Sequence, residues 1–171
     1  MVAPVRNGRG IVALRDFPVG SVVCRIGGRI VDSSVLWRWW DRQPQRAANC
    51  LRFDEERYLE PGRGIGAFLN HSCRPNTLIE RSGRFLVVRA LRPIAAGQEV
   101  TNDYSTLIGP DDVWTMRCNC GERGCRRTIR RLDRLPAARL KSYRASGAIP
   151  AFLLQMLEDR RRGARRRSTP V

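Results

Sequence analysis

Long apolar runs are missing from this sequence of 171 residues. No segment approaches the roughly 20 consecutive apolar residues that a membrane-spanning helix needs. The first ten residues carry two arginines and no apolar stretch of signal-peptide length. We therefore expect a soluble, cytoplasmic protein without a membrane partner. A specialised secretion route or an association with the nucleus would leave no such signal, and the sequence excludes neither.

Histidine is almost absent, since His71 is the only one. A hydrolytic site of the Cys–His type needs a histidine base paired with a nucleophile. With a single histidine and no candidate nucleophile in a suitable pattern beside it, the sequence argues against a hydrolase of this type.

Lysine is also scarce, although the protein is strongly basic. Its 32 basic and 16 acidic residues give a net charge of +16, and Lys141 is the only lysine. Residues 126–171 hold 14 basic and 3 acidic residues, so most of the excess charge lies behind the last cysteine. The planar guanidinium group suits phosphate or carboxylate. Arg126–Arg167 is therefore a candidate surface for nucleic acid or an acidic partner, although a GC-rich genome produces the same bias. We expect Arg160–Arg167 to be mobile.

The composition is that of a single globular domain, with 42% hydrophobic and 28% charged residues. Short β-branched runs between turn residues predict a mainly β fold. The predicted strands are Ile11–Leu14, Val22–Ile26, Arg29–Val31, Leu51–Phe53 and Tyr58–Glu60. Thr77–Arg81 and Arg84–Ala90 flank the turn dipeptide Ser82-Gly83, which predicts a hairpin.

Helices are predicted in two regions. Ser33–Gln43 opens with two serines that can cap a helix, and Leu36, Trp37 and Trp40 share the face expected to enter the core, while Trp39 points elsewhere. The second region follows the last cysteine, and its helical pattern is formed by Ile129, Leu132, Leu135, Leu140 and Tyr143, then by Pro150–Leu157.

Three of the six cysteines form the pattern Cys118-x-Cys120-x4-Cys125 in a loop that contains glycine. Closely spaced cysteines supply thiolate ligands to tetrahedral zinc. Disulfides are the weaker alternative, because a bridge between Cys118 and Cys120 would be strained and nothing indicates an oxidising compartment. The fourth ligand must come from elsewhere, and the residues alone leave four candidates open: Cys73, Cys24, Cys50 and His71.

Several ordered motifs resemble those of SET domains. Asn70-His71-Ser72-Cys73-Arg74-Pro75-Asn76 is similar to the family's Asn-His-Ser-Cys-x-Pro-Asn signature, and the segment from Gly97 to Tyr104 is similar to Gly-Glu-Glu-Leu-Thr-x-Asp-Tyr. The cysteine pattern then resembles the post-SET segment, and Asn7 to Ala13 resembles the Gly-x-Gly opening strand. The resemblance covers about residues 6–128.

The resemblance implies a fold of small sheets with a pseudoknot, in which the Asn-His-Ser strand crosses the Asp-Tyr segment. It also implies three parts: a SET domain at 1–108, a zinc-binding post-SET segment at 109–128 and a helical extension with a basic tail at 129–171. By resemblance the cysteine of the signature completes the zinc site. The implied ligands are therefore Cys73, Cys118, Cys120 and Cys125.

The resemblance further implies methylation of lysine in a protein or peptide, with S-adenosylmethionine as methyl donor. Gly8, Arg9 and Gly10 would present backbone groups to the donor, because glycine allows close approach. Asn70 would hold the donor from the other side through its amide, and His71 mainly through its backbone, so that His71 need not act as a base.

Tyr104 would lie between the donor and the substrate channel and orient the lysine amine with its hydroxyl. Tyr58 is a second candidate for the channel wall, although the family's Tyr-x-x-Asp-Ala reads Tyr58-Leu59-Glu60-Pro61 here. Asn102 replaces the Phe or Tyr that governs methyl number in the family, so the number of methyl groups stays open. The alternative is an inactive, zinc-stabilised SET-like module that binds nucleic acid through its arginine-rich tail.

Overall fold

The computed structural model describes residues 1–167, with side chains described for residues 1–160 and for residue 162. Its strands are β1 (Val2–Val5), β2 (Gly8–Val12), β3 (Val22–Ile26), β4 (Arg29–Asp32), β5 (Leu51–Arg52), β6 (Arg57–Glu60), β7 (Asn70–His71), β8 (Thr77–Ser82), β9 (Phe85–Ala90), β10 (Glu99–Asn102), β11 (Met116–Arg117) and β12 (Thr128–Ile129). Its α-helices are α1 (Ser33–Arg42), α2 (Pro44–Ala48), α3 (Ala137–Ala145) and α4 (Ala151–Arg167), and its 3-10 helices are η1 (Ile65–Phe68), η2 (Tyr104–Leu107) and η3 (Leu132–Arg134).

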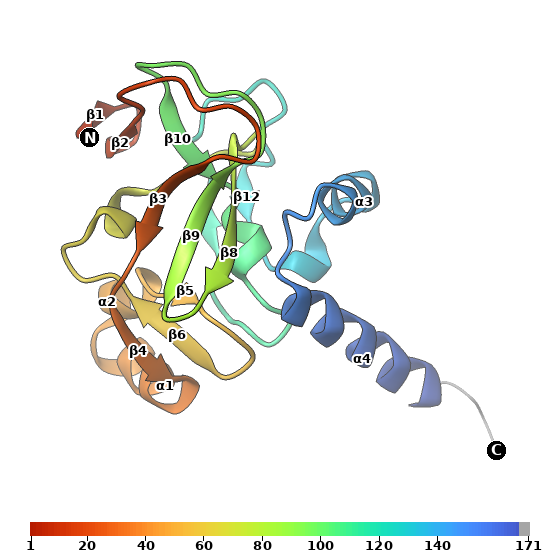
Figure 1. Ribbon diagram of the computed structural model, residues 1–171. Coiled ribbons are helices and arrows are strands. Elements are labelled where there is room, and N and C mark those ends of the chain that lie inside the picture. Colours follow the sequence, from red (N-terminus) through yellow and green to blue (C-terminus); the bar gives the residue numbers. More distant parts are fainter. Residues whose placement is uncertain (168–171) are drawn as a thin grey trace.

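The strands form several small sheets, which confirms the predicted mainly β fold. Their orders are β1-β2-β10-β7, β3-β9-β8, β4-β6-β5 and β11-β12. In Figure 1 the β3-β9-β8 sheet occupies the centre, with β1, β2 and β10 above it and β4, β6, α1 and α2 below. One buried cluster joins three of these sheets, and it includes Ile11, Ile26, Leu59, Val88 and Val100. The sheets therefore share a core, although each is too small to bury a face alone.

The predicted hairpin is present as β8 and β9, paired from Thr77↔Ala90 to Ser82↔Phe85. Gly83 has a φ of 57°, which explains why glycine occupies the turn. The first strand prediction began too late, because β2 runs over Gly8–Val12 instead of Ile11–Leu14. The strand starts earlier because it pairs with β1 as far as Val5↔Gly8. The sequence analysis did not predict β1.

Two details of the first predicted helix were wrong. The residue preceding α1 is Asp32, no side chain caps the helix, and the Ser33 amide donates instead to the Glu56 carbonyl at 2.7 Å. This bond follows from the β4-β6 pairing, which carries the chain from strand to helix without a loop. Leu36 and Trp39 are the buried residues of the helix, whereas Trp37 is only half-buried. The helix packs against both the β4-β6 sheet and α2. The spacing of apolar residues within the helix does not reveal the contact with α2.

The region after the last cysteine is less helical than its pattern predicted. Ile129 belongs to β12, where it pairs with Met116, and Leu132 belongs to η3. Leu132, Tyr143 and Leu153 enter one buried cluster together with Leu78 of β8, so α3 and α4 pack on the β8 side of the domain (Figure 1). The proposed division of the chain at residues 108 and 128 stays a prediction.

Helix α4 is longer than expected. It continues through the arginine run to Arg167. The expectation that Arg160–Arg167 is mobile stays a prediction. The remaining tail, residues 168–171, lies outside the described residues. No helix within the described part of the chain is both long and apolar enough to cross a membrane.

Strands β7 and β10 bring the two main motifs together. They pair in parallel, Thr101↔Asn70 and Asn102↔His71, across about thirty residues of intervening chain. The pairing continues past the strands, since the Ser72 amide donates to the Asn102 carbonyl at 3.0 Å. The side chain of Asn76 then accepts from the Thr101 amide at 2.8 Å. The motif segments 70–76 and 97–104 therefore lie side by side, as the resemblance implied.

Candidate methyl-transfer site

Asn70 connects the first strand pair to the motif strands. Its amide Nδ2 donates to the Arg9 carbonyl at 3.1 Å and to Glu99 Oε1 at 2.8 Å. The guanidinium of Arg9 lies 4.8 Å from the centre of the Phe68 ring. The structure therefore places β2 against Asn70, which is the arrangement that a shared ligand site requires.

Gly10 is fixed by close approach and not by an unusual φ. A Cβ atom at this position would lie 2.5 Å from Glu99 Oε1 and 2.8 Å from Asn70 Nδ2. Gly8, by contrast, has a φ of 86° and open space around it. The two glycines of the motif thus serve different purposes: Gly8 makes the turn, and Gly10 lets β2 approach Asn70.

His71 is buried and neutral. Burial lowers its pKa to about 4, and the charge of Arg126 acts in the same direction, although Asp103 opposes both. Its Nδ1 accepts a hydrogen bond from the Tyr104 amide at 3.2 Å. The imidazole therefore holds the backbone of Tyr104 in place, which agrees with a site in which His71 is not a base.

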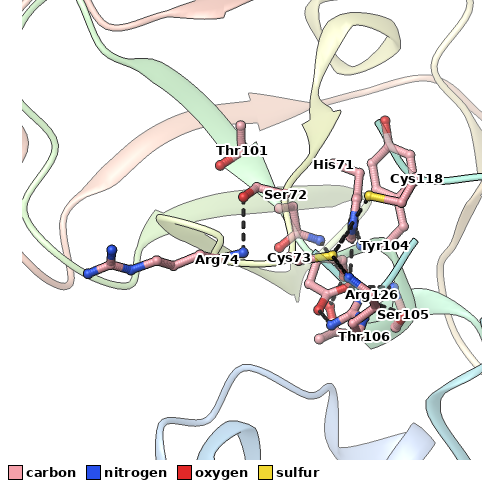
Figure 2. Close-up of polar contacts among 12 residues, drawn as sticks. His71, Ser72, Cys73, Arg74, Thr101, Tyr104, Ser105, Thr106, Cys118 and Arg126 are labelled. Atoms are coloured by element: carbon pink, nitrogen blue, oxygen red, sulfur yellow. Dashed lines mark hydrogen bonds and ion pairs between the residues drawn. The ribbon is translucent and has the colours of Figure 1, made fainter. Parts of the chain in front are cut away.

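Tyr104 lies at the junction of the motifs, as Figure 2 shows beside His71 and Cys118. Its hydroxyl donates to the Leu69 carbonyl at 2.7 Å, and its ring centre lies 5.3 Å from that of His71 and 6.0 Å from that of Trp114. Burial raises its pKa to about 12, and Glu99 adds to the effect. The phenol therefore stays protonated and serves as a hydrogen-bonding group.

Two cavities lie next to the His71–Tyr104 ring pair: Tyr104 lines one of them, and His71 lines the other. The aromatic cavity has a volume of about 230 Å³, and its lining includes Trp40, Tyr58, Tyr104 and Trp114. The polar cavity has a volume of about 330 Å³, and its lining includes Asn7, His71, Asn76, Glu99, Cys120 and Glu122. The ring pair therefore separates a largely apolar space from a polar one.

Tyr58 lines the aromatic cavity, as the sequence predicted for a channel wall. The hydrogen bonds of its hydroxyl are to other residues than Tyr104: it donates to Asp112 Oδ1 at 2.5 Å and accepts from Arg52 at 2.9 Å. Burial and the charge of Asp112 raise its pKa far above the usual range. Tyr58 therefore belongs to a buried polar network in the cavity wall.

Four of the cysteines, Cys73, Cys118, Cys120 and Cys125, form a cluster beside His71. Cys73 Sγ lies 3.7 Å from Cys118 Sγ and 3.4 Å from His71 Nε2. Two thiolates bound to tetrahedral zinc at about 2.3 Å each lie about 3.8 Å apart. The spacing of Cys73 and Cys118 thus fits zinc, and all six cysteines of the chain are free thiols.

Four ligand atoms, those of His71, Cys73, Cys118 and Cys120, lie within 4.8 Å of one another. Cys125 packs in the same cluster but stands slightly apart, with its Sγ 4.0 Å from the Cys118 carbonyl. Cys24 and Cys50, two other candidates for the fourth ligand, lie in other clusters. Three of the four expected ligands, Cys73, Cys118 and Cys120, therefore lie together with His71, and Cys125 as the fourth ligand stays a prediction.

Several residues of the site were not found from the sequence. Trp114 lies in an irregular segment, and no motif marks it as a cavity residue. Asp103 belongs to the quoted Asp-Tyr pair, yet its partners Arg126 and Tyr143 are distant in sequence. Glu99 and Asp103 had a visible signal, because both belong to the Gly97–Tyr104 motif.

Small sheets around two paired motif segments, with a cysteine cluster behind them and a tyrosine between two cavities, define the class of SET-type folds. The chain belongs to the SET-domain family, whose sequence model matches residues 8–105.

The relatives are named as histone-lysine N-methyltransferases. Trithorax of Drosophila virilis is 30% identical over 131 residues, 72% of this chain and 3% of the relative. Human histone-lysine N-methyltransferase 2B is 31% identical over 131 residues, 72% of this chain and 5% of the relative. The H3 lysine-4 specific enzyme of Saccharomyces cerevisiae is 38% identical over 82 residues, 44% of this chain and 8% of the relative. The chain thus spans a small fraction of these proteins.

A solved structure gives the same result for the fold. The methyltransferase domain of human histone-lysine N-methyltransferase SETMAR superposes with a TM-score of 0.60 at 26% sequence identity. The match covers 74% of this chain and 55% of that domain.

Proposed function

We propose that this protein transfers a methyl group from S-adenosylmethionine to the side-chain amine of lysine in a protein or peptide. The observation that carries the proposal is the His71–Tyr104 ring pair, whose members line the polar and the aromatic cavity respectively. Methyl transfer needs two such binding spaces that meet at one point, because donor and acceptor must be aligned.

The polar cavity fits the methyl donor. It lies beside the start of β2, where Asn7 lines it. Asn70 does not line the cavity itself, but it precedes His71 and donates to Glu99, which both line it. When bound there, S-adenosylmethionine would supply an electrophilic methyl group. Asn70, His71 and the backbone of Gly8 to Gly10 would hold it, and the neutral imidazole would add no charge beside a cationic donor.

The aromatic cavity fits the lysine side chain. Its aromatic walls exclude water, and the nucleophile of the reaction is the neutral amine. The protonated hydroxyl of Tyr104 would orient that amine through a hydrogen bond. The acceptor protein is not fixed by these features, although the relatives' names make a histone one candidate.

Zinc would be held by Cys73, Cys118 and Cys120 with Cys125 as the fourth ligand, and its role would be structural. The ion would tie the loop of residues 118–125 to the motif strand at Cys73. Because Cys120 lines the polar cavity, the same ion would fix one wall of the donor site.

Nucleic-acid binding through Arg126–Arg167 has weaker support. Arg126 is already engaged, since its guanidinium donates to both carboxylate oxygens of Asp103 at 2.5 and 2.6 Å. Arg131 pairs with Asp133 at 3.1 Å. Arg126 and Arg131 are therefore engaged in contacts within the domain.

Isothermal titration of the zinc-loaded full chain with S-adenosylmethionine tests the proposal. We expect binding by the wild type, loss of at least tenfold in affinity for Asn70→Ala, and unchanged binding for Asn49→Ala. Asn49 is the matched control because it is exposed and lines the aromatic cavity instead of the polar one. A folded wild type that does not bind S-adenosylmethionine would remove the proposed function.

A further inference from the structure

The aromatic cavity contains one buried acid–base pair in an otherwise uncharged wall. Among its lining residues in the described part of the chain, only Arg52 and Asp112 carry charge. Arg52 is 2% exposed and Asp112 is 7% exposed. Charged side chains are buried to this extent only when other groups compensate their charge.

The positive and negative charges of this group do not balance. Arg52 donates to Asp112 Oδ2 at 3.0 Å and to Asp111 Oδ1 at 2.9 Å, so one guanidinium faces two carboxylates. The local group therefore has a net charge of −1. The side chain of Asp111 is 49% exposed and does not line the cavity, so water solvates that carboxylate. Asp112 is the negative member of the charged pair in the cavity wall, and it shares the guanidinium of Arg52 with Asp111.

Asp112 is held rigidly in the wall. Its Oδ1 accepts from Tyr58 at 2.5 Å, and its Oδ2 accepts from the Gly109 amide at 2.6 Å. Burial nevertheless leaves its pKa above the usual range, although Tyr58, Arg52 and Gly109 all act in the opposite direction. A cation beside the carboxylate would favour its ionised form.

The same cavity has aromatic faces that also favour a cation. Trp40, Tyr104 and Trp114 contribute to its lining together with Asp112. Aromatic rings attract a cation within about 6 Å of their centres, most strongly in the case of tryptophan. Two independent features of one cavity, a carboxylate and a set of rings, thus suit the same kind of ligand.

We propose that Asp112 is the residue that recognises the substrate lysine as a cation, with Arg52 and Tyr58 as its positioning residues. This inference rests on the proposed function, because it assigns the aromatic cavity to the acceptor. A free lysine amine has a pKa near 10.4, so it arrives as an ammonium ion near neutral pH. Asp112 would capture that form on entry, and the loss of the proton before methyl transfer is a separate step.

A lysine side-chain analogue tests the inference without the methyl donor. The zinc-loaded full chain is titrated with n-butylammonium and, separately, with neutral 1-butanol, and the fluorescence of the cavity tryptophans reports binding. We expect the wild type to prefer the cation. Asp112→Asn should weaken n-butylammonium binding at least tenfold and leave 1-butanol binding unchanged.

Asp111→Asn is the matched control, because Asp111 pairs with the same arginine outside the cavity. It should keep the preference for the cation. Equal affinities of wild type and Asp112→Asn for n-butylammonium would overturn the inference, and so would an equal loss in Asp111→Asn.

Tyr58→Phe covers the case in which Asp112→Asn fails to fold. This variant removes one positioning hydrogen bond to Asp112 and keeps the carboxylate, so the preference for n-butylammonium should weaken but persist. Its disappearance in folded Tyr58→Phe would overturn the inference. Because S-adenosylmethionine is absent throughout, a failure here is distinct from a failure of donor binding in the titration of the Asn70→Ala variant.

Discussion

Asp103 is the residue on which three separate parts of the chain converge. Its side chain is fully buried and accepts hydrogen bonds from Arg126 behind the last cysteine and from Tyr143 of α3. It also accepts from the Ser105 amide at 3.1 Å, which caps η2 directly beside Tyr104. A single carboxylate therefore connects the position of the proposed catalytic tyrosine to the cysteine loop and to the C-terminal helices.

Replacing Asp103 with asparagine should destabilise the protein strongly. The substitution leaves the largely buried guanidinium of Arg126 without its counter-charge, and breaking a buried ion pair costs about 3–5 kcal/mol in comparable cases. Urea unfolding of zinc-loaded wild type and variant measures the difference.

Glu80→Gln is the control for this prediction. Glu80 pairs with Arg89 at the surface, where both side chains are partly exposed. Exposed pairs contribute about 0–1 kcal/mol, so this variant should unfold almost as the wild type does. Similar losses in the two variants would contradict the importance given to the buried pair.

At the scale of elements, the C-terminal helices are part of the domain and not an appendage. Leu153 of α4 and Tyr143 of α3 are buried in the same cluster as Leu78 of β8. Arg160 also donates from α4 to the Pro110 carbonyl at 2.5 Å, on the loop that holds Asp112. The extension therefore supports the wall of the aromatic cavity from behind.

Leu153→Ala should lower the free energy of unfolding by about 2–5 kcal/mol, because it opens a cavity in a fully buried cluster. Leu14→Ala is the matched control, since Leu14 is 72% exposed. Denaturant unfolding followed by circular dichroism measures both. A separate, earlier transition of the helices, with the main transition unchanged, would show that the extension folds independently.

At the scale of the whole molecule, the cysteine cluster links segments that are far apart in the chain. Cys73 follows the motif strand β7, and Cys118 and Cys120 follow β11, more than forty residues later. No strand pairing joins these two segments directly. A metal ion at this point would therefore hold the loop against the domain, in addition to the hydrogen bond from Ser72 to Glu122.

Removing zinc with a chelator should lower the urea midpoint of unfolding and weaken S-adenosylmethionine binding together. The reason is that Cys120 belongs both to the cluster and to the wall of the polar cavity. Metal analysis of the purified protein should give about one zinc per chain.

Cys24→Ser is the control for metal binding, because Cys24 lies in the main core away from the cluster. It should retain its zinc and its donor binding. A metal-free protein with unchanged stability and unchanged donor affinity would contradict the structural role of zinc.

The sequence by itself determined the features that depend on local order. Short β-branched runs placed most strands, Gly83 marked the hairpin, and the spacing of the three late cysteines indicated a metal site. The motifs around Asn70 and Tyr104 indicated the family, because each motif is contiguous in the chain. These features could be recognised without knowing which segments meet.

Only the tertiary structure decided how distant segments combine. It buried Trp39 instead of Trp37, joined Asp103 to Tyr143, and placed Asp112 in the wall of the aromatic cavity. These outcomes depend on which surfaces face one another after folding, and residue spacing carries no information about that. The charge pattern of the aromatic cavity is therefore a property of the folded molecule, since Arg52, Tyr58 and Asp112 come together only there.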